Sequence, residues 1–264
     1  MASETAPIIT LTTDFGLSDY FVGAVKGVLL CQIPEANLVD ITHLIPRHDI
    51  ISAAFVVNEI HGCFPQGTIH VAVVDPGVGS ARRKIIVTYE GQFFVAPDNG
   101  ILSYILREPE SRVFEVLETP FLRLKESPTF AGRDHFSRIA AALAKGISPT
   151  MLGKEIFDAQ QMDLFFKKKE GKVLTGKIVY FDCFGNAITN LTQEILKAHL
   201  KNPERFTADL EGKKLVGLKK KYLEAEEGMG SLIINSSGYL EIFIVNDSAK
   251  NILNLNLNNK IIIS

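Results

Sequence analysis

Short runs of hydrophobic residues alternate with amphipathic segments from residue 8 to residue 144. Runs rich in Val and Ile that end at turn residues predict strands, and hydrophobic positions with helical spacing predict helices. Asp49 comes directly before one of these helices and is a candidate N-cap. An alternation of strands and helices is typical of an α/β domain with a parallel or mixed sheet under helical cover. The predicted strands are 8–12, 38–41, 69–74, 84–89, 92–96 and 113–116, and the predicted helices are 20–31, 50–60, 101–106 and 136–144.

The pattern changes after residue 162, where short strand-like runs follow one another between turns. This spacing favours a smaller antiparallel barrel or sandwich. The charged run from Phe165 to Lys172 is typical of an exposed connection, so we expect an α/β domain at 1–162, a linker at 163–172 and a β domain at 173–264. The alternating Leu and Asn residues from Leu253 to Asn259 predict a loop or a surface strand. The predicted strands are 173–180, 206–210, 213–216, 231–235, 239–245 and 260–263.

Composition excludes several classes of protein. A formal net charge of -2 over 264 residues gives no reason to expect a nucleic-acid partner. The hydrophobic runs are short and interrupted, so no membrane partner or transmembrane helix is expected, and the first residues do not resemble a signal peptide. Three scattered cysteines without a Cys-x-x-Cys pair favour reduced thiols in the cytoplasm, and no metal site is expected.

The most informative motif runs from Val73 to Arg83. A buried strand ends there at Asp75, a turn rich in Pro and Gly follows, and Arg82 comes shortly after. Ligands of open α/β sheets bind beyond the carboxyl ends of the strands, so Asp75 and Arg82 are candidates for one site, where an acid held beside an arginine could orient a water molecule. The alternative interpretation of this motif is a plain turn with a surface ion pair.

Three further segments carry candidate chemistry. Asp14 follows the first predicted strand and could accept hydrogen bonds from a ribose diol, while Asp19 is either a ligand residue or an N-terminal helix acid. In the segment 181–190, Asn186 suits the edge of an adenine and Phe184 could stack on a base, although a strand followed by a turn explains the same pattern. In the segment 129–136, Arg133 and Asp134 could form a local ion pair, and His135 is expected to be structural.

Taken in order, these segments resemble the S-adenosylmethionine hydroxide adenosyltransferase family, which is related to the fluorinases and chlorinases. The resemblance covers nearly the whole chain and implies a C-terminal β-barrel, a homotrimer with sites between subunits, and no cofactor. It implies that S-adenosylmethionine and water give adenosine and methionine through attack at the ribose C5′. The matching segments are 12–16, 74–79, 96–100, 132–134, 184–186, 189–190 and 235–242.

The same resemblance implies roles for individual residues. Asp75 and Arg82 would hold and activate the water, and Asp14 would bind the ribose diol. The remaining substrate-binding residues would contact the methionine ammonium (Asp19), the ribose or substrate amine (Asp182), the adenine (Phe184, Asn186 and the backbone around Asn246), and the methionine carboxylate (Ser236).

Two positions depart from the family pattern, and one of them is Ser237, where the fluorinases have a basic residue near the methionine carboxylate. Hydrolases of the family place a histidine before the Gly-Arg-Asp segment, where this chain has Ala131. Either Asp75 and Arg82 suffice, or another histidine such as His135 takes the role, or the chain is a sensor that binds S-adenosylmethionine or adenosine without turnover. A halide-dependent lyase is the third interpretation, and Asp75 argues against it because a carboxylate would occupy the place of the anion.

Overall fold

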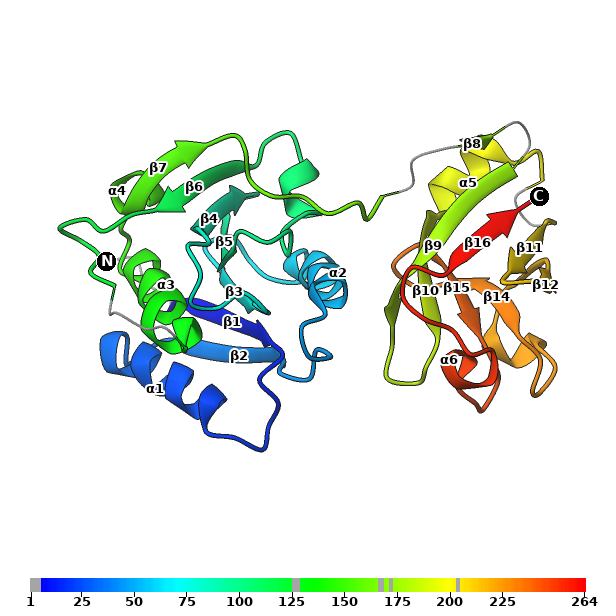
Figure 1. Ribbon diagram of the computed structural model, residues 1–264, viewed down its shortest axis with the longest axis horizontal. Coiled ribbons are helices and arrows are strands. Elements are labelled where there is room, and N and C mark those ends of the chain that lie inside the picture. The colour runs from blue at the N-terminus through cyan, green and yellow to red at the C-terminus, as the bar shows by residue number, and fades with distance from the viewer. Residues whose placement is uncertain (1–5, 125–128, 166–168, 171–172, 203–204) are drawn as a thin grey trace. The chain divides into compact units, whose positions relative to one another are not determined.

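The computed structural model describes residues 6–124, 129–165, 169–170, 173–202 and 205–264 (Figure 1). The chain divides into two compact units, residues 1–162 and residues 163–264. Part of the charged run at 165–172 lies outside the described residues, so its role as a linker stays a prediction. In the part of the chain that the structure describes, no helix is both long and apolar enough to span a bilayer.

A mixed sheet forms the centre of the first unit. Among its described residues, seven strands follow the order β2-β1-β3-β5-β4-β6-β7. The first four pair in parallel, and β4, β6 and β7 continue the sheet in antiparallel register. Every residue of β3 is buried, as expected for a strand covered on both faces. The strands are β1 (Ile8–Thr13), β2 (Asn37–Thr42), β3 (Ile69–Val73), β4 (Lys84–Tyr89), β5 (Gln92–Pro97), β6 (Arg112–Val116) and β7 (Gly153–Ile156).

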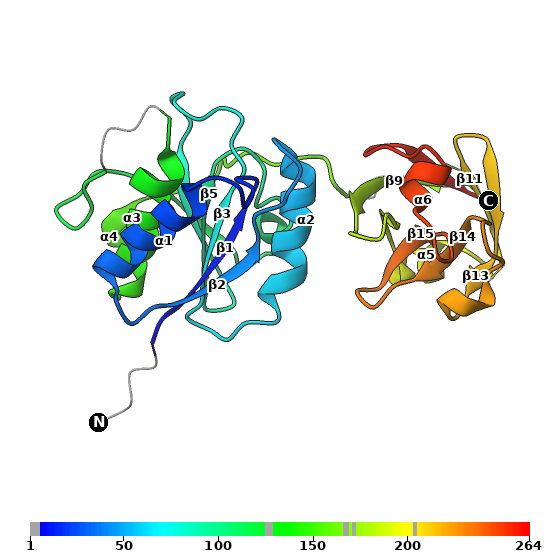
Figure 2. The same cartoon turned by 90° about the horizontal axis from the view of Figure 1, so that it is seen from below.

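Helices cover both faces of this sheet. Figure 2 shows α1 (Phe21–Gln32) and α3 (Ser137–Ala144) on one side and α2 (Ile50–His61) on the other. Ala140, Ala141 and Ala142 of α3 are buried, and their small side chains let this helix pack closely against α1 and β3. Asp49 accepts a hydrogen bond from the Ser52 backbone N–H at 3.0 Å, which confirms the predicted N-cap of α2. A π-helical turn (Gly132–Phe136) precedes α3, and α4 (Pro149–Leu152) precedes β7.

The predicted helix at 101–106 is wrong. The structure has turns there, followed by a single 3-10 turn at Ile105–Arg107. The Asn99 side chain accepts a hydrogen bond from the Ile101 N–H, and the Ser103 hydroxyl donates to the Gly100 carbonyl. These local side-chain bonds compete with helical hydrogen bonds, which explains why an apolar run does not become an α-helix here.

The second unit is a β-barrel, as the sequence analysis predicts. Among its described residues, the strand order is β12-β11-β16-β9-β10-β15-β14-β13, and β8 adds to β9. All pairs are antiparallel except β13 with β14, and β12 approaches β14, so the sheet nearly closes on itself. The elements are β8 (Lys169–Glu170), β9 (Val173–Phe181), β10 (Ala187–Thr192), α5 (Gln193–His199), β11 (Thr207–Leu210), β12 (Lys213–Val216), β13 (Leu218–Lys219), a 3-10 turn (Tyr222–Glu224), β14 (Ser231–Ile234), β15 (Tyr239–Phe243), α6 (Ala249–Ile252) and β16 (Lys260–Ile263).

The Leu and Asn residues between α6 and β16 form turns. Leu253, Leu255 and Leu257 belong to or pack against the core of the barrel. Asn254 and Asn258 take positive φ values of 52° and 66°. Asparagine tolerates this left-handed conformation better than most residues, so the alternation combines core anchors with turn residues.

The order of the strands creates a crevice in the first unit. After β1 the chain passes through α1 to β2 on one side, and after β2 it returns through α2 to β3 on the other side of β1. The connections therefore diverge at the carboxyl ends of β1 and β3. In open α/β sheets, ligands bind at this kind of switch point.

Candidate functional site

Asp14 and Asp75 lie together at this switch point. Thr13 pairs with Val73 in the register of β1 and β3, so Asp14 and Asp75 follow neighbouring strand ends. Both carboxylates line a small cavity of about 120 Å³, which we call the Asp14 cavity. Its other lining residues are Phe15, His48, Val73, Val78, Thr129, Phe130, Ala131 and Gly132.

Asp75 and Arg82 form a close ion pair. Arg82 Nη1 donates to Asp75 Oδ1 at 2.6 Å, and the Gly77 N–H donates to the same oxygen at 2.9 Å. The Asp75 side chain is 10% exposed, so the pair is more buried than the surface ion pair of the alternative interpretation. A turn is also present, since the Val78 N–H bonds to the Asp75 carbonyl.

Gly77 makes room for the arginine. A Cβ atom at this position would overlap the guanidinium of Arg82. We expect Gly77→Ala to push Arg82 away from Asp75 while changing the free energy of unfolding by less than about 1 kcal/mol, because the obstructed group is the end of a flexible side chain. Chemical denaturation and a crystal structure of the variant measure the two effects. An unchanged Arg82–Asp75 distance would contradict this account of Gly77.

A larger cavity of about 400 Å³ adjoins the ion pair, and we call it the Asp75 cavity. Asp75 and Ala131 line both this cavity and the Asp14 cavity, so the two spaces meet at these residues. Ala131 is 7% exposed and comes directly before the π-helical turn. His135 lines the larger cavity as well. The other lining residues are Gly77, Gly79, Ser80, Arg82, Arg83, Lys84, Pro97 and Phe136.

The loop before α2 holds Asp14 through a backbone N–H group. The His48 N–H donates to Asp14 Oδ2 at 2.9 Å, and His48 takes a positive φ of 64°. Asp19 is exposed and lines neither the Asp14 cavity nor the Asp75 cavity. The N-cap of α1 is Tyr20, which makes no capping hydrogen bond, and the first turn of α1 has no acidic residue. The N-cap interpretation of Asp19 therefore has no support, and its ligand role stays a prediction. Arg133 and Asp134 form the local ion pair expected from the sequence, at 2.7 Å.

The second unit has a cavity of about 620 Å³, which we call the Asp182 cavity. Four predicted site residues line it together. Asp182 accepts hydrogen bonds from the Phe184 and Asn186 N–H groups and from the Asn186 side chain, at 3.0, 2.8 and 2.9 Å. The turn thus fixes Asn186, while the ring of Phe184 is 74% exposed. The cavity is lined by Asp182, Phe184, Asn186, Tyr222, Leu223, Phe243, Ile244, Val245, Asn246, Asp247 and Ser248.

A buried carboxyl lies beside this cavity. Glu241 is 3% exposed and accepts hydrogen bonds from the Tyr222 hydroxyl at 2.9 Å and the Asn235 side chain at 3.2 Å. Burial raises the pKa of Glu241 above its ordinary value, against the opposing effect of these two hydrogen bonds. Burial and the neighbouring Glu241 raise the pKa of Tyr222 to about 12, so its hydroxyl stays a donor at neutral pH.

The raised pKa of Glu241 makes stability depend on pH. When a carboxyl has a higher pKa in the folded state than in the unfolded state, the protein loses stability as the pH rises from the unfolded-state pKa through the folded-state pKa. We therefore expect the wild type to lose stability relative to Glu241→Gln between acidic and neutral pH. Urea denaturation of both proteins across this range measures the difference. A difference that does not change with pH, or that changes in the opposite sense, would contradict the raised pKa.

Ser236 lies in the turn between β14 and β15. Asn235 Oδ1 accepts hydrogen bonds from the Ser237 and Tyr239 N–H groups at 3.1 and 3.0 Å, so the turn is held from within. Ser236 itself is exposed and does not line the Asp182 cavity. Its predicted contact with a methionine carboxylate stays a prediction.

Several residues in or beside these cavities could not be identified from sequence patterns. His48 reaches Asp14 through its backbone, and Tyr222 and Glu241 meet across 19 residues of chain, so no local motif marks them. Lys84 follows Arg82 and Arg83 directly, and this run of basic residues is a signal that the sequence does carry. Among the described residues, no three His, Cys, Asp or Glu side chains gather in a way that could hold a metal ion.

Comparison with known sequences shows which protein family matches this chain. Residues 9–153 match the family model for the SAM hydroxide adenosyltransferase N-terminal domain, and residues 176–262 match that for the C-terminal domain. A Thermus thermophilus protein named (R)-S-adenosyl-L-methionine hydrolase is 36% identical over 92% of this chain and 94% of its own. A Methanocaldococcus jannaschii protein of the same name is 33% identical over 97% of this chain and 95% of its own. A fluorinase of Actinoplanes sp. is 27% identical over 92% of each chain.

Solved structures agree with the fold. The crystal structure of an uncharacterized conserved protein from Thermotoga maritima superimposes with a TM-score of 0.87. It is 28% identical, and the match covers 97% of this chain and 99% of that one. The match therefore includes both the α/β unit and the β-barrel of this chain.

Proposed function

Because the chain belongs to the S-adenosylmethionine hydroxide adenosyltransferase family, we propose that it is an enzyme that hydrolyses S-adenosyl-L-methionine to adenosine and L-methionine. The observation that carries this proposal is the partly buried Asp75–Arg82 pair at the switch point of the sheet. It lies beside Asp14, within cavities that can admit water and a ligand.

The reaction is a substitution at the ribose C5′. A water oxygen bonds to C5′, the bond from C5′ to sulfur breaks, and the electron pair stays on the methionine thioether. The water releases one proton, so the products are neutral adenosine, methionine and a proton. The reaction balances with substrate and water alone, so we propose that no cofactor takes part.

Asp75 orients the attacking water in this proposal. Its Oδ1 is held by Arg82 and by the Gly77 N–H, which fixes the carboxylate. A fixed carboxylate can accept a hydrogen bond from water and direct the oxygen lone pair at C5′. Since reaction needs the oxygen, C5′ and sulfur in line, positioning supplies a large part of the rate. The carboxylate also repels an anion at the same place, which disfavours halide as the nucleophile.

Charge loss is the second source of rate. The sulfonium cation of the substrate becomes a neutral thioether, so a site that excludes water destabilises the substrate more than the product. The apolar walls of the Asp14 cavity, Phe15, Val73, Val78 and Phe130, suit this role. His135, in the lining of the larger cavity, is a candidate to receive the released proton.

We assign the binding contacts by group. Asp14 binds the ribose diol and Asp19 the methionine ammonium. In the barrel unit, Phe184, Asn186 and the backbone at Asn246 face adenine, Asp182 the ribose or the substrate amine, and Ser236 the methionine carboxylate. Support comes from the Asp182 cavity, which gathers Asp182, Phe184, Asn186 and Asn246 in one lining.

Asp14→Ala should weaken adenosine and S-adenosylmethionine together. Loss of hydrogen bonds to a charged acceptor costs roughly 1.5–3 kcal/mol, which is about a tenfold to hundredfold rise in both dissociation constants. Isothermal titration calorimetry measures each ligand. Methionine alone, which has no ribose, serves as the control and should bind as before. Unchanged affinity for both nucleosides would remove Asp14 from the ribose site.

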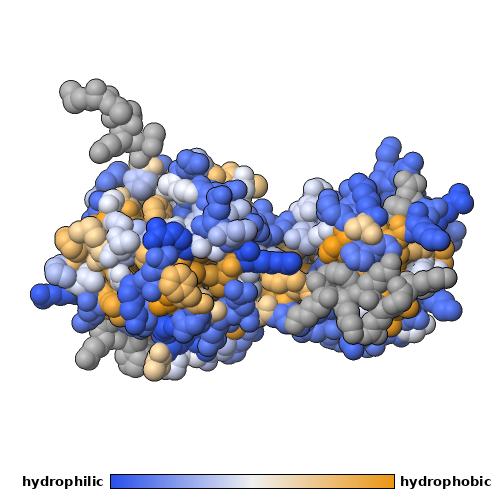
Figure 3. Space-filling model, turned by 90° about the horizontal axis from the view of Figure 1, so that it is seen from above, coloured by the Kyte–Doolittle hydropathy of each residue, from blue (hydrophilic) through white to orange (hydrophobic). Residues whose placement is uncertain are grey.

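We propose further that the active form is a cytoplasmic homotrimer, with each site built from the α/β unit of one subunit and the barrel of its neighbour. Phe184 and Leu223, on the rim of the Asp182 cavity, are 74% and 88% exposed, and a partner surface would cover them. Figure 3 shows hydrophobic residues on the surface of both units. The three cysteines are exposed and unpaired by disulfides, in keeping with a reducing compartment. Analytical ultracentrifugation tests the trimer.

Product analysis tests the proposed function. The purified protein is incubated with each sulfonium epimer of S-adenosylmethionine, with and without chloride, and the products are separated by chromatography. Adenosine and methionine in equal amounts, independent of chloride, are the expected products, and the name of the relatives points to the (R) epimer. Formation of 5′-chloroadenosine would make the chain a halide-dependent lyase. Tight binding without any product would make it a sensor.

A further inference from the structure

The turn after β5 forms hydrogen bonds with Val74 and Arg83, which adjoin Asp75 and Arg82 in the chain. This turn consists of Asp98, Asn99 and Gly100, and none of the roles assigned above uses it. β5 lies next to β3 in parallel register, so the turn comes at the same edge of the sheet as Asp75. Asp98 is 2% exposed and Asn99 is 8% exposed, and buried polar side chains of this kind are held by specific partners.

Asn99 holds the backbone that leads to Asp75. Its side-chain N–H donates to the Val74 carbonyl at 2.8 Å, and its side-chain oxygen accepts from the Ile101 N–H at 3.1 Å. Val74 is 0% exposed and precedes Asp75 directly. The amide of Asn99 therefore fixes the peptide unit from which the Asp75 side chain departs.

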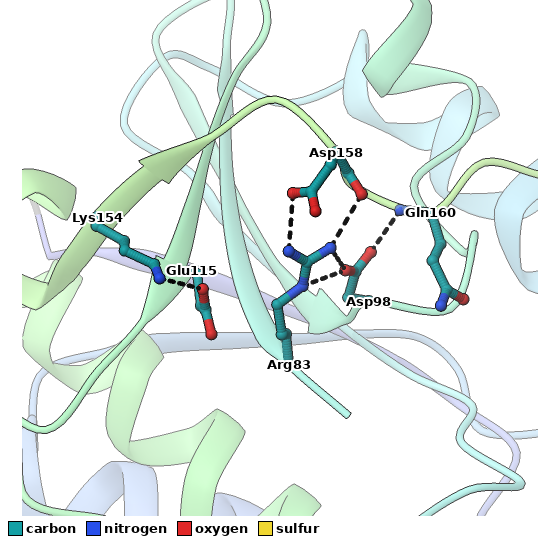
Figure 4. A network of polar contacts seen from close by, with 6 residues as sticks. All are labelled: Arg83, Asp98, Glu115, Lys154, Asp158 and Gln160. Atoms are coloured by element: carbon teal, nitrogen blue, oxygen red, sulfur yellow. Dashed lines mark hydrogen bonds and ion pairs between the residues drawn. The ribbon is translucent and has the colours of Figure 1, made fainter. Parts of the chain in front are cut away.

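Asp98 holds the backbone that leads to Arg82. Asp98 Oδ2 accepts from Arg83 at 2.6–2.8 Å, and Asp98 Oδ1 accepts from the Gln160 N–H at 2.8 Å (Figure 4). The other side of the Arg83 guanidinium bonds to the side chain and carbonyl of Asp158, at 2.8 and 2.9 Å. The Asp98 N–H also donates to the Arg83 carbonyl at 3.0 Å. The side-chain hydrogen bonds to Asp158 and to Asp98 raise the pKa of Arg83, so its guanidinium stays charged at neutral pH.

We propose that Asp98 and Asn99 are positioning residues for the Asp75–Arg82 pair. The turn holds the backbone beside Asp75 and the backbone beside Arg82. It therefore sets the distance between the carboxylate and the guanidinium. This inference rests on the proposed function for its effect on rate, although the geometry itself does not depend on it. Neither residue lines the Asp14 cavity or the Asp75 cavity, so both act through the backbone that they hold.

Turnover gives the first test. Asp98→Asn and Asn99→Ser should each lower kcat about tenfold and change KM less than about twofold, because displaced catalytic groups affect the reaction more than ground-state binding. Glu155→Gln is the matched control, since it breaks the Arg112–Glu155 pair between β6 and β7, away from the cavities. This control should keep the parent kcat. A lower melting temperature with unchanged kcat per folded molecule would show a role in stability alone and overturn the proposal.

The guanidinium of Arg82 gives a second test that does not need activity. In the parent, its nitrogen-15 NMR signals should be separate because the ion pair slows rotation, and Arg82→Lys assigns them. We expect these signals to merge in Asp98→Asn and to stay separate in Glu155→Gln. If Asp98→Asn does not fold, Asp158→Ala takes its place in this test. The Asp158 side chain also bonds to Arg83, and because it is 76% exposed its replacement should not prevent folding. Unchanged signals overturn the proposal even if the parent hydrolyses substrate, and a parent without hydrolysis overturns only the proposed function.

Discussion

Ala131→His should raise the rate of adenosine formation by ~10²–10⁴-fold, the range expected for a positioned general base. Ala131 borders both cavities and shares each lining with Asp75, so an imidazole at this position would lie beside the proposed water. The larger cavity, at about 400 Å³, has room for the ring. The gain should be in kcat, with little change in KM, because the new group acts on the nucleophile.

The pH profile identifies the new base. A histidine accepts a proton only when neutral, so kcat of the variant should rise with pH through about 6.5, and by a larger factor than kcat of the parent. Ala131→Leu adds similar bulk without a proton acceptor and serves as the control. A histidine variant no faster than the parent, or a leucine variant equally fast, would mean that residue 131 does not face the water.

Asp75→Asn should have the opposite effect and lower kcat by ~10²-fold or more. The amide oxygen of the variant can still accept from Arg82 and from the Gly77 N–H, so the turn should keep its shape. What is lost is the negative charge that orients the water. Adenosine affinity, measured by calorimetry, should stay nearly constant.

Asp209→Asn is the matched control for this substitution. Asp209 also accepts a hydrogen bond from a glycine N–H in a turn, at 2.8 Å from Gly212, but lies in the barrel, away from the Asp182 cavity. Its variant should keep the parent rate. If Asp75→Asn is as active as Asp209→Asn, then Asp75 does not act on the nucleophile.

The strands and the proximity of Asp14 and Asp75 could be predicted from the sequence because both depend on local patterns. Runs of Val and Ile mark β3 and β4, and Asp14 and Asp75 stand within two residues of the ends of predicted strands. Parallel strand ends meet at one edge, so their proximity follows once the α/β alternation is recognised. Short strand patterns between turns predicted a barrel or a sandwich for the second unit, and the family resemblance implied the barrel.

Contacts between distant segments were beyond the sequence. Arg83 meets Asp158 across 75 residues, and a single chain gives no signal that pairs them. The failed helix at 101–106 has a related cause, because the Asn99 and Ser103 side chains take hydrogen bonds that the apolar pattern does not record. The exposure of Asp19 and Ser236 likewise depends on how chains pack, which periodicity does not describe.

Isotope transfer from water tests the central claim most directly. The protein is incubated with S-adenosylmethionine in water enriched in oxygen-18, and the masses of the products are measured by mass spectrometry. Attack of water at C5′ predicts adenosine that carries one heavy oxygen, located on the ribose fragment, and methionine that carries none. Adenosine without the label, labelled methionine, or release of free adenine would contradict hydrolysis at C5′ and with it the role assigned to Asp75 and Arg82.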